Sequence, residues 1–355
     1  MRDAGEVMKS LKLPVAALRP FLESLFEAAG VPKEDAATVT DSFLESNLRG
    51  VDTHGVRLIP AYIRRLREGG VNPSPNIRSV SDLGATLRLD GDNGLGQVVG
   101  CYAMRTAIER AGKYGIGMVI AGKTSHIGAA SYYTRMPLKQ HMAGFATSNN
   151  LPSLFVWGGL KRAISNPPFS VSFPSRKTPF VLDICLGTVA WNKIYMRLQN
   201  GEDIPEGWAW DPDGNPTTSA EKAAKGSIIP IGGHKGSSLT LAVDLFTGVL
   251  GGFAFADQVS ALLTNDQDPE NSSCLMMAIN VGRILGTEVL DRAEQLIDWC
   301  KDSPLATGFS EILMPGEPEE KIRSQRLQEG IPVPQEDVRA LAELGEASSL
   351  EVPFR

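Results

Sequence analysis

Apolar residues recur at helical spacing in several parts of the chain. Residues 14–48 place apolar side chains three or four positions apart and are interrupted at Gly30-Val31-Pro32, which predicts a helical hairpin. The helices predicted beyond this hairpin cover residues 60–67, 98–113, 239–250 and 289–298.

Short apolar or alternating runs between these helices predict strands. Residues 117–121 are continuously apolar, which is typical of a buried strand, and residues 169–173 alternate. The predicted strands cover residues 86–90, 117–121, 143–148, 169–173, 180–183 and, as the last, 275–279. Residues 199–219 are rich in Gly and Pro and predict a loop. The helix at 289–298 is expected to be the last, followed from Met314 by a charged tail.

Composition narrows the class of protein. The 355 residues are 42% hydrophobic and 21% charged, as in an ordinary globular protein. The net charge of −6 argues against a nucleic-acid partner, because phosphate binding requires a basic face. No stretch approaches the roughly 20 apolar residues of a membrane span, and the start of the chain, with Asp3 and Glu6, does not resemble a signal peptide. We therefore expect a cytoplasmic protein without a membrane partner.

Cysteine and histidine positions show where chemistry is to be sought. The four cysteines lie far apart without the CxxC spacing of zinc or redox sites, so we expect no metal. Three of the four histidines, His54, His126 and His234, lie in polar turns that contain glycine. A metal-dependent hydrolase using these three as ligands is a rival hypothesis, although none has a partner at metal-ligand spacing.

His126 lies in a predicted strand-to-helix turn. Its ordinary pKa of about 6.5 suits a general acid or base, and Ser125 and Gly128 allow the backbone to approach a ligand. The alternative is a loop histidine that makes a structural hydrogen bond.

His54 and His234 each have basic neighbours. Arg49 and Arg57 flank His54, and a guanidinium binds a carboxylate through two parallel hydrogen bonds; the alternative is a helix-capping turn with solvated charges. In the turn at 232–236, backbone amides and Lys235 suit a phosphate, whereas the alternative role of its glycines is packing.

A dinucleotide fingerprint of the Rossmann type is missing from the sequence. The Gly94-x-Gly96 fragment is too short and poorly placed for that motif, which needs three glycines that open a helix after a strand and an acidic residue about 20 positions further on. A dinucleotide would therefore be bound by a different fold.

Eight short segments occur in the order found in one enzyme family. They are Arg49-Gly50-Val51-Asp52-Thr53-His54-Gly55-Val56, Asp90-Gly91-Asp92-Asn93-Gly94-Leu95-Gly96-Gln97, Ser125-His126-Ile127-Gly128, Ser165-Asn166-Pro167, Leu182-Asp183, Pro216-Thr217-Thr218, Gly232-Gly233-His234-Lys235-Gly236 and Met314-Pro315-Gly316-Glu317. With them the chain resembles the type-2 malate/L-lactate dehydrogenase family, which also includes ureidoglycolate, sulfolactate and Δ1-piperideine-2-carboxylate enzymes.

The resemblance implies a non-Rossmann α/β (α+β) fold with a central, largely antiparallel sheet flanked by helices. It implies a helical lobe of residues 1–80 joined by the C-terminal segment 301–355, a central cofactor-binding and catalytic region at 81–300, and a homodimer. It also implies a reaction that interconverts a small 2-hydroxy acid and its 2-oxo acid with NAD or NADP.

The resemblance also implies roles for individual residues. His126 would be the general acid/base, and His54, the other expected catalytic residue, would face the substrate and help to hold its carboxylate. The substrate would contact Thr53, Tyr62 and, through its carboxylate, Arg49 or Arg57. The expected cofactor contacts are Asn150, Asp183, Ile184, Cys185, His234 and Lys235.

The chain departs from the family pattern at three places. Thr53 replaces the usual serine, Leu58 stands where an arginine is common, and Ser237-Ser238 replaces Gly-Tyr. Alternatives on the same fold are a reductase of a cyclic imine acid, an enzyme for a ureidoglycolate-type substrate, or a non-catalytic dinucleotide-binding protein.

Overall fold

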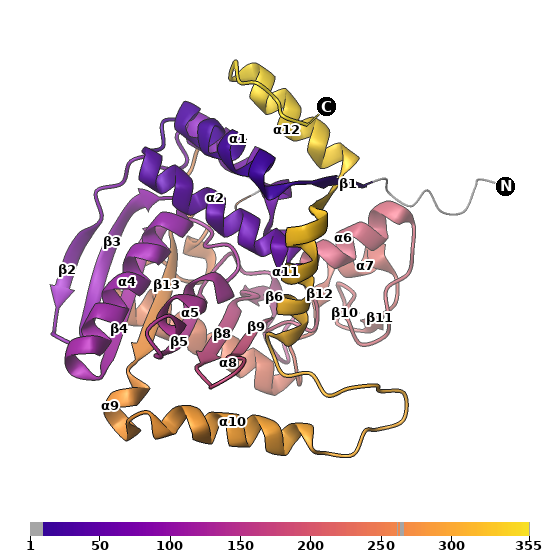
Figure 1. Cartoon of the computed structure of the whole chain (residues 1–355). Helices are drawn as coiled ribbons and strands as arrows, with labels where there is room; N and C mark the ends of the chain where they lie inside the picture. Colours follow the sequence, from indigo (N-terminus) through magenta and orange to yellow (C-terminus); the bar gives the residue numbers. More distant parts are fainter. Residues whose placement is uncertain (1–9, 261, 263–265, 355) are drawn as a thin grey trace.

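A seven-stranded sheet forms the centre of the molecule (Figure 1). The computed structural model describes residues 10–260, 262 and 266–354. From one edge to the other the strands are β2 (Arg78–Asp82), β3 (Thr86–Gly94), β4 (Ile116–Thr124), β13 (Ser272–Ile279), β5 (Ala143–Ser148), β8 (Pro168–Phe173) and β9 (Phe180–Cys185). β3 and β4 run parallel, whereas the other neighbouring pairs of this sheet are antiparallel. The predicted, largely antiparallel sheet is confirmed.

Helices cover both faces of this sheet, as β4 illustrates. Val119 and Ala121 are buried in one core with helix α4 (Gly96–Tyr114), and α5 (Ser131–Leu138) packs beside α4. Ile120 points to the other face, where it contacts Gly251. That face is covered by α8 (His234–Asp244) and the π-helix that continues it (Leu245–Val249). Burial on both faces explains why β4 reads as a continuous apolar run.

The two ends of the chain meet in one helical layer. β1 (Ser10–Leu13) pairs antiparallel with β14 (Ile331–Pro334), and Figure 1 shows α12 beside α1. One buried apolar core joins both strands to the surrounding helices. These helices are α1 (Val15–Ala28), α2 (Lys33–Leu48), α3 (Ile59–Glu68) and α12 (Gln335–Ala347). The predicted hairpin is confirmed, and the division at residues 80 and 301 stays a prediction.

The segment after Met314 is rich in charge, as expected, but it forms a helix, a strand and a helix. α11 (Glu317–Glu329) precedes β14 and α12, so neither β13 nor α10 (Glu288–Lys301) is the last element of its kind. None of the residues of α11 is buried. Arg323 and Arg326 instead attach it by ion pairs to α2 and to the turn that follows α2. A helix held by charges lacks the apolar periodicity on which the prediction relied.

A small substructure with its own core lies beside the sheet, to the right in Figure 1. Along the chain, α6 precedes and α7 follows most of the loop predicted at residues 199–219. The sequence pattern predicted neither helix. The elements of this substructure are β6 (Leu154–Phe155), β7 (Arg162–Ile164), α6 (Trp191–Asn200), β10 (Ala209–Trp210), β11 (Pro216–Thr217), α7 (Ala220–Lys225) and β12 (Ser227–Ile228). In the part of the chain described, no helix combines the length and apolar character that a membrane crossing requires.

Candidate active site

The structure brings His54 and His126 together from turns that are far apart in sequence. His126 follows β4, and His54 ends a short 3-10 helix (Asp52–His54). Their rings are nearly parallel, with 5.4 Å between centroids and 22° between planes. Both histidines line a cavity of about 770 Å³, called here the reaction cavity. That volume lies in the range of small-molecule and cofactor sites.

The turn that carries His54 is held by polar contacts on its outer side. Asn47 donates from Nδ2 to Asp52 Oδ1 at 2.7 Å and accepts the Val56 N–H at 2.8 Å. Arg326 of α11 forks onto both Asp52 oxygens. A Cβ on Gly55 would stand 2.2 Å from the Asn47 side chain, so glycine is required there. Within the turn, Thr53 Oγ1 lies 3.0 Å from His54 Nδ1.

Tyr62 of α3 forms hydrogen bonds with His126. The Tyr62 hydroxyl is 2.7 Å from His126 Nδ1 and 3.0 Å from the His126 carbonyl oxygen, to which it can donate. Gln97 Nε2 donates to the same hydroxyl at 3.0 Å. We expected Tyr62 to face the substrate, but it is 1% exposed and lies beneath the His126 ring. It contacts the histidine and does not line the reaction cavity.

Gly96 explains the incomplete glycine motif at the start of α4. A Cβ there would stand within 2.4 Å of the carbonyl oxygens of Ser125 and His126. The Gly96 N–H donates to Ser125 Oγ at 2.9 Å. The glycine therefore allows α4 to pack against the His126 turn, which is a structural role.

Burial keeps both histidines neutral. Desolvation lowers the pKa of His54 to about 4, and desolvation together with the neighbouring His54 lowers the pKa of His126 to about 3. Burial, followed by the charge of Glu270, raises the pKa of the Tyr62 hydroxyl. At neutral pH the site thus holds two uncharged imidazoles and a protonated phenol.

Four of the six expected cofactor residues line the reaction cavity: Asn150, Asp183, Ile184 and Cys185. Asp183 accepts the Ser131 N–H at 2.7 Å, and burial raises its pKa to about 6. The structure therefore brings the end of β9, the start of α5 and the His126 turn to the same cavity.

His234 and Lys235 lie outside the cavity lining. They begin α8 after Gly232 and Gly233, which both have positive φ, and both side chains are exposed. Trp157 is the aromatic neighbour of His234, 6.1 Å away between centroids. The nearest lining residue in sequence is Ile231. Since His234 is separate from the histidine pair, the three histidines form no common site, and no group of potential metal ligands occurs among the described residues.

Comparison with known proteins identifies the family of this chain. The sequence model of the malate/L-lactate dehydrogenase family matches residues 13–342. The chain belongs to the malate/L-lactate dehydrogenase family. It is 38% identical to L-sulfolactate dehydrogenase of Methanocaldococcus jannaschii over 84% of this chain and 86% of that protein. It is 33% identical to malate dehydrogenase of Pyrococcus horikoshii over 96% of both chains.

Solved structures of the malate/L-lactate dehydrogenase family have the same fold. The sulfolactate dehydrogenase from Methanocaldococcus jannaschii superposes with a TM-score of 0.91, covering 96% of this chain and 98% of that chain at 34% identity. The malate dehydrogenase from Pyrococcus horikoshii OT3 gives 0.88 at 31% identity and covers 99% of both. This chain is therefore an enzyme of a hydroxy acid dehydrogenase family.

In this family member neither of the two arginines beside His54 is among the residues that line the reaction cavity. Arg49 pairs with Glu45 and Glu320, at 3.1 and 2.8 Å. Arg57 faces Asp337 of α12, whose pKa it lowers against the stronger raising effect of burial. Leu58 lines the cavity instead. Side chains that neighbour His54 in sequence point in different directions around the short helical turn. The order of residues along the chain does not reveal these directions.

Glu270 is a site residue of this dehydrogenase that the sequence reasoning missed. Its Oε2 accepts the His126 N–H at 3.0 Å, and it lines the reaction cavity. Arg65 of α3, fully buried, lies 3.6 Å from its Oε1. Burial raises the pKa of Glu270 to about 7. It precedes β13 in a segment without any motif, so only the fold reveals its contact with His126.

Proposed function

We propose that this enzyme interconverts a small 2-hydroxy acid and its 2-oxo acid with NAD or NADP, and that His126 is the general acid/base. The supporting observation is the neutral His54–His126 pair on the wall of the reaction cavity, with Tyr62 behind His126. Oxidation of a hydroxy acid requires a base for the hydroxyl proton, and a neutral imidazole can accept it.

The hydrogen bonds around Tyr62 favour one tautomer of His126. If Tyr62 donates its one proton to the His126 carbonyl, its oxygen accepts from both Gln97 and His126 Nδ1–H. The lone pair is then on Nε2, for which no described residue provides a partner. We propose that Nε2 takes the proton from the substrate hydroxyl and returns it during reduction.

His54 and Thr53 are proposed to hold the substrate. If the Thr53 hydroxyl donates to His54 Nδ1, His54 Nε2 carries a proton and can donate to a substrate oxygen. Such a neutral donor orients a carboxylate or the C2 oxygen beside His126. Lys193 and Arg135 are the basic side chains along the lining as described, and neither adjoins His54 in sequence.

Residues at the end of β9 fit a dinucleotide. The reaction cavity is large and mostly apolar, with polar groups from Asn150 and Asp183 at separate points along it. When bound, the nicotinamide would supply the hydride acceptor. We propose that Asn150 and residues 183–185 position the cofactor, and that Lys235 and His234 contact its phosphate or ribose end beyond Ile231. Lys235→Ala should then raise the KM of the cofactor more than that of the substrate.

An absorbance assay at 340 nm tests this function. Purified protein is mixed with NADH or NADPH and a panel of 2-oxo acids that includes the malate, lactate and sulfolactate partners and one cyclic imine acid. Consumption of the cofactor with a 2-oxo acid supports the proposal, and turnover of the imine acid alone would assign the reductase alternative. Quenching of NADH fluorescence without turnover of any substrate would contradict both.

We also propose that the enzyme is a homodimer that buries the outer face of α8 and the π-helix. This face is apolar and exposed, whereas Thr240 and Asp244 point inward. Its exposed apolar side chains are Leu239, Leu241, Leu245, Phe246, Val249 and Leu250. An apolar face of this kind is typical of a covered surface. Light scattering should give a dimer mass, and Phe246→Glu should give a monomer; a monomeric wild type would contradict the proposal.

A further inference from the structure

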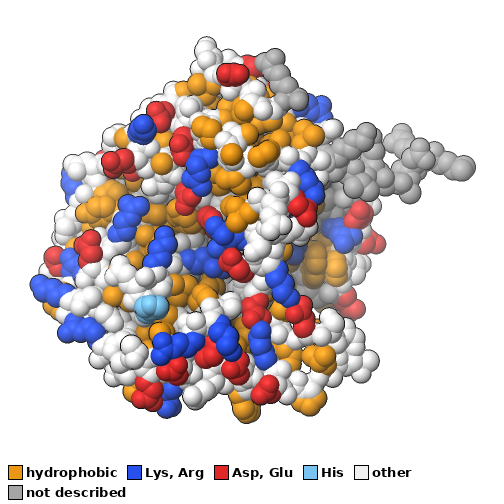
Figure 2. Space-filling model, viewed as in Figure 1, with side chains coloured by type: hydrophobic (Ala, Val, Ile, Leu, Met, Phe, Trp, Pro, Cys, Tyr) orange, Lys and Arg blue, Asp and Glu red, His pale blue; other side chains and the backbone are white. Residues whose placement is uncertain are grey.

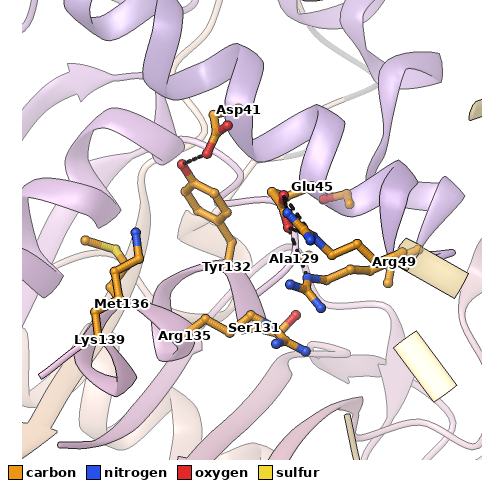
Figure 3. Close-up of a pocket in the computed structure, with 12 residues that line it drawn as sticks. Asp41, Glu45, Arg49, Ala129, Ser131, Tyr132, Arg135, Met136 and Lys139 are labelled. Carbon is orange, nitrogen blue, oxygen red and sulfur yellow. Dashed lines mark hydrogen bonds and ion pairs between the residues drawn. The ribbon is translucent and has the colours of Figure 1, made fainter. Parts of the chain in front are cut away.

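A second cavity, of about 250 Å³, lies between α2, α5 and α11. We call it the arginine cavity, after Arg49, Arg135 and Arg323, which line it together with Lys139. Figure 3 shows Arg49 and Arg135 reaching into this space from opposite sides, with Ser131 between them. On the surface above, basic and acidic side chains are intermixed across the middle of the face (Figure 2).

Most charges in the arginine cavity are paired. Glu45 binds both Arg49, at 3.1 Å, and Arg323, at 3.0 Å. Asp41 is occupied by Arg19 at 2.7 Å and by the Tyr132 hydroxyl at 3.0 Å. Neither carboxylate forms an ion pair with Arg135 or Lys139 in the part of the chain described.

Arg135 makes only a long ion pair, to Glu320. Its side chain is 19% exposed, and its closest carboxylate oxygen, on Glu320, is 4.0 Å away, beyond hydrogen-bonding distance. Its buried Nε has no hydrogen-bond partner in the described part of the chain. Desolvation, followed by repulsion from Arg49, lowers the pKa of Arg135 to about 10, so the guanidinium is still charged at neutral pH. A desolvated cation with unused donors is unfavourable unless an anion fills the gap.

Lys139 adds a second available cation. It caps the C-terminal end of α5, one turn beyond Arg135, and its side chain is exposed. No acidic side chain of the described residues pairs with it. Together the lining side chains carry an excess of positive charge around a space of about 250 Å³.

We propose that the arginine cavity is a binding site for a small oxyanion, a carboxylate or phosphate, held by Arg135 and Lys139. The planar guanidinium offers paired N–H donors that match two oxygens of such an ion, and the ammonium adds a point charge at the entrance. Because Val51, Ala129, Ser131 and Arg135 line both cavities, the bound ion would border the reaction cavity.

Calorimetric titration and thermal unfolding of the cofactor-free enzyme test this site. Sodium phosphate and sodium succinate are compared with sodium chloride at equal ionic strength. At least one oxyanion should bind saturably and raise the Tm. Arg135→Met, which keeps the length of the stem and removes the charge, should weaken that binding roughly tenfold or more.

Two exposed lysines provide the matched control. Lys139 lines only the arginine cavity, and Lys193 lines only the reaction cavity. Lys139→Met should weaken anion binding, whereas Lys193→Met should leave it unchanged. This pair decides the question even if Arg135→Met fails to fold. The absence of saturable binding to the wild type, or equal affinity in wild type and Lys139→Met, would overturn the proposal. Neither measurement requires turnover of a substrate, and the Lys139→Met and Lys193→Met pair distinguishes the arginine cavity from the reaction cavity.

Discussion

The reaction cavity and the arginine cavity share lining residues, but the pKa values of their ionisable groups are shifted in opposite ways: toward the neutral form in the first and, for paired groups, toward the charged form in the second. In the reaction cavity, burial without ion pairs lowers the pKa of the histidines and raises that of Asp183 to about 6. At the arginine cavity, paired groups stay charged. Desolvation would raise the pKa of Glu320, but the hydrogen bond and charge of Arg49 lower it overall. The hydrogen bond to Glu45 raises the pKa of Arg323.

This difference shows that the available partner, and not burial alone, decides the charge state of a group. A site for proton transfer needs neutral imidazoles that can gain and lose a proton. A site that joins helices, or that holds an anion, needs permanent charges. The four predictions below test this contrast, from the largest expected effect to the smallest.

Replacing His126 with glutamine should cause the largest loss. If His126 transfers the proton, kcat/KM in His126→Gln should fall by about 10²–10⁴-fold. The affinity for the cofactor, measured by NADH fluorescence titration, should stay unchanged because the change is confined to the proton-transfer group. Near-normal turnover would remove His126 from the mechanism.

The lowered pKa of His126 predicts a specific pH dependence of stability. Between the unfolded pKa, about 6.5, and the folded value, about 3, the unfolded state binds more protons. The contribution of His126 is therefore fully present above pH 6.5 and is lost as the pH falls toward its folded pKa. Relative to His126→Gln, the wild type should lose up to about 1 kcal/mol of unfolding free energy per pH unit.

Urea unfolding of both proteins at pH 7, 6 and 5 measures that difference. A wild type that gains stability relative to His126→Gln on acidification would mean that His126 is charged and paired in the folded state.

Tyr62→Phe should reduce kcat by about three- to tenfold, the equivalent of one lost hydrogen bond. The phenyl ring keeps the packing against Phe43 but leaves Gln97 and His126 Nδ1 without the hydroxyl. Because Tyr62 contacts the histidine and not the cavity, the KM of the substrate should change little. A rise in KM at constant kcat would instead place Tyr62 at the substrate.

Glu45→Gln should have the smallest effect, and it should lower stability while leaving kcat unchanged. It removes the carboxylate shared by Arg49 and Arg323, so the free energy of unfolding should fall by about 1 kcal/mol. The value of kcat should stay unchanged, since neither Arg49 nor Arg323 lines the reaction cavity. Steady-state kinetics beside thermal unfolding checks both parts, and a loss of kcat larger than the loss of stability explains would show that the two cavities are coupled.

Elements with a strong apolar period were predictable because their burial is written into the local sequence. The hairpin α1–α2, the long helix α4 and strand β4 are examples. α11 was not predictable, since it is attached by Arg323 and Arg326 and buries no side chain. The spacing of apolar residues in a sequence indicates apolar burial but gives no information about ion pairs.

The site shows the same limit. Glycine-containing turns identified His54 and His126, but the direction of each neighbouring side chain depended on partners elsewhere in the chain. Arg49 turns to Glu320, and Glu270 reaches the His126 backbone across 144 positions of sequence.

The sequence by itself determined the family, the principal helices and strands and the two histidine turns, because apolar periods and glycine-containing turns are local. Only the tertiary structure decided that the imidazoles lie 5.4 Å apart, that Tyr62 contacts His126, and that Arg49 lines a different cavity while Arg57 faces Asp337. The physical reason is that charge state and hydrogen bonding depend on distance and solvent exclusion between segments, which only the fold sets.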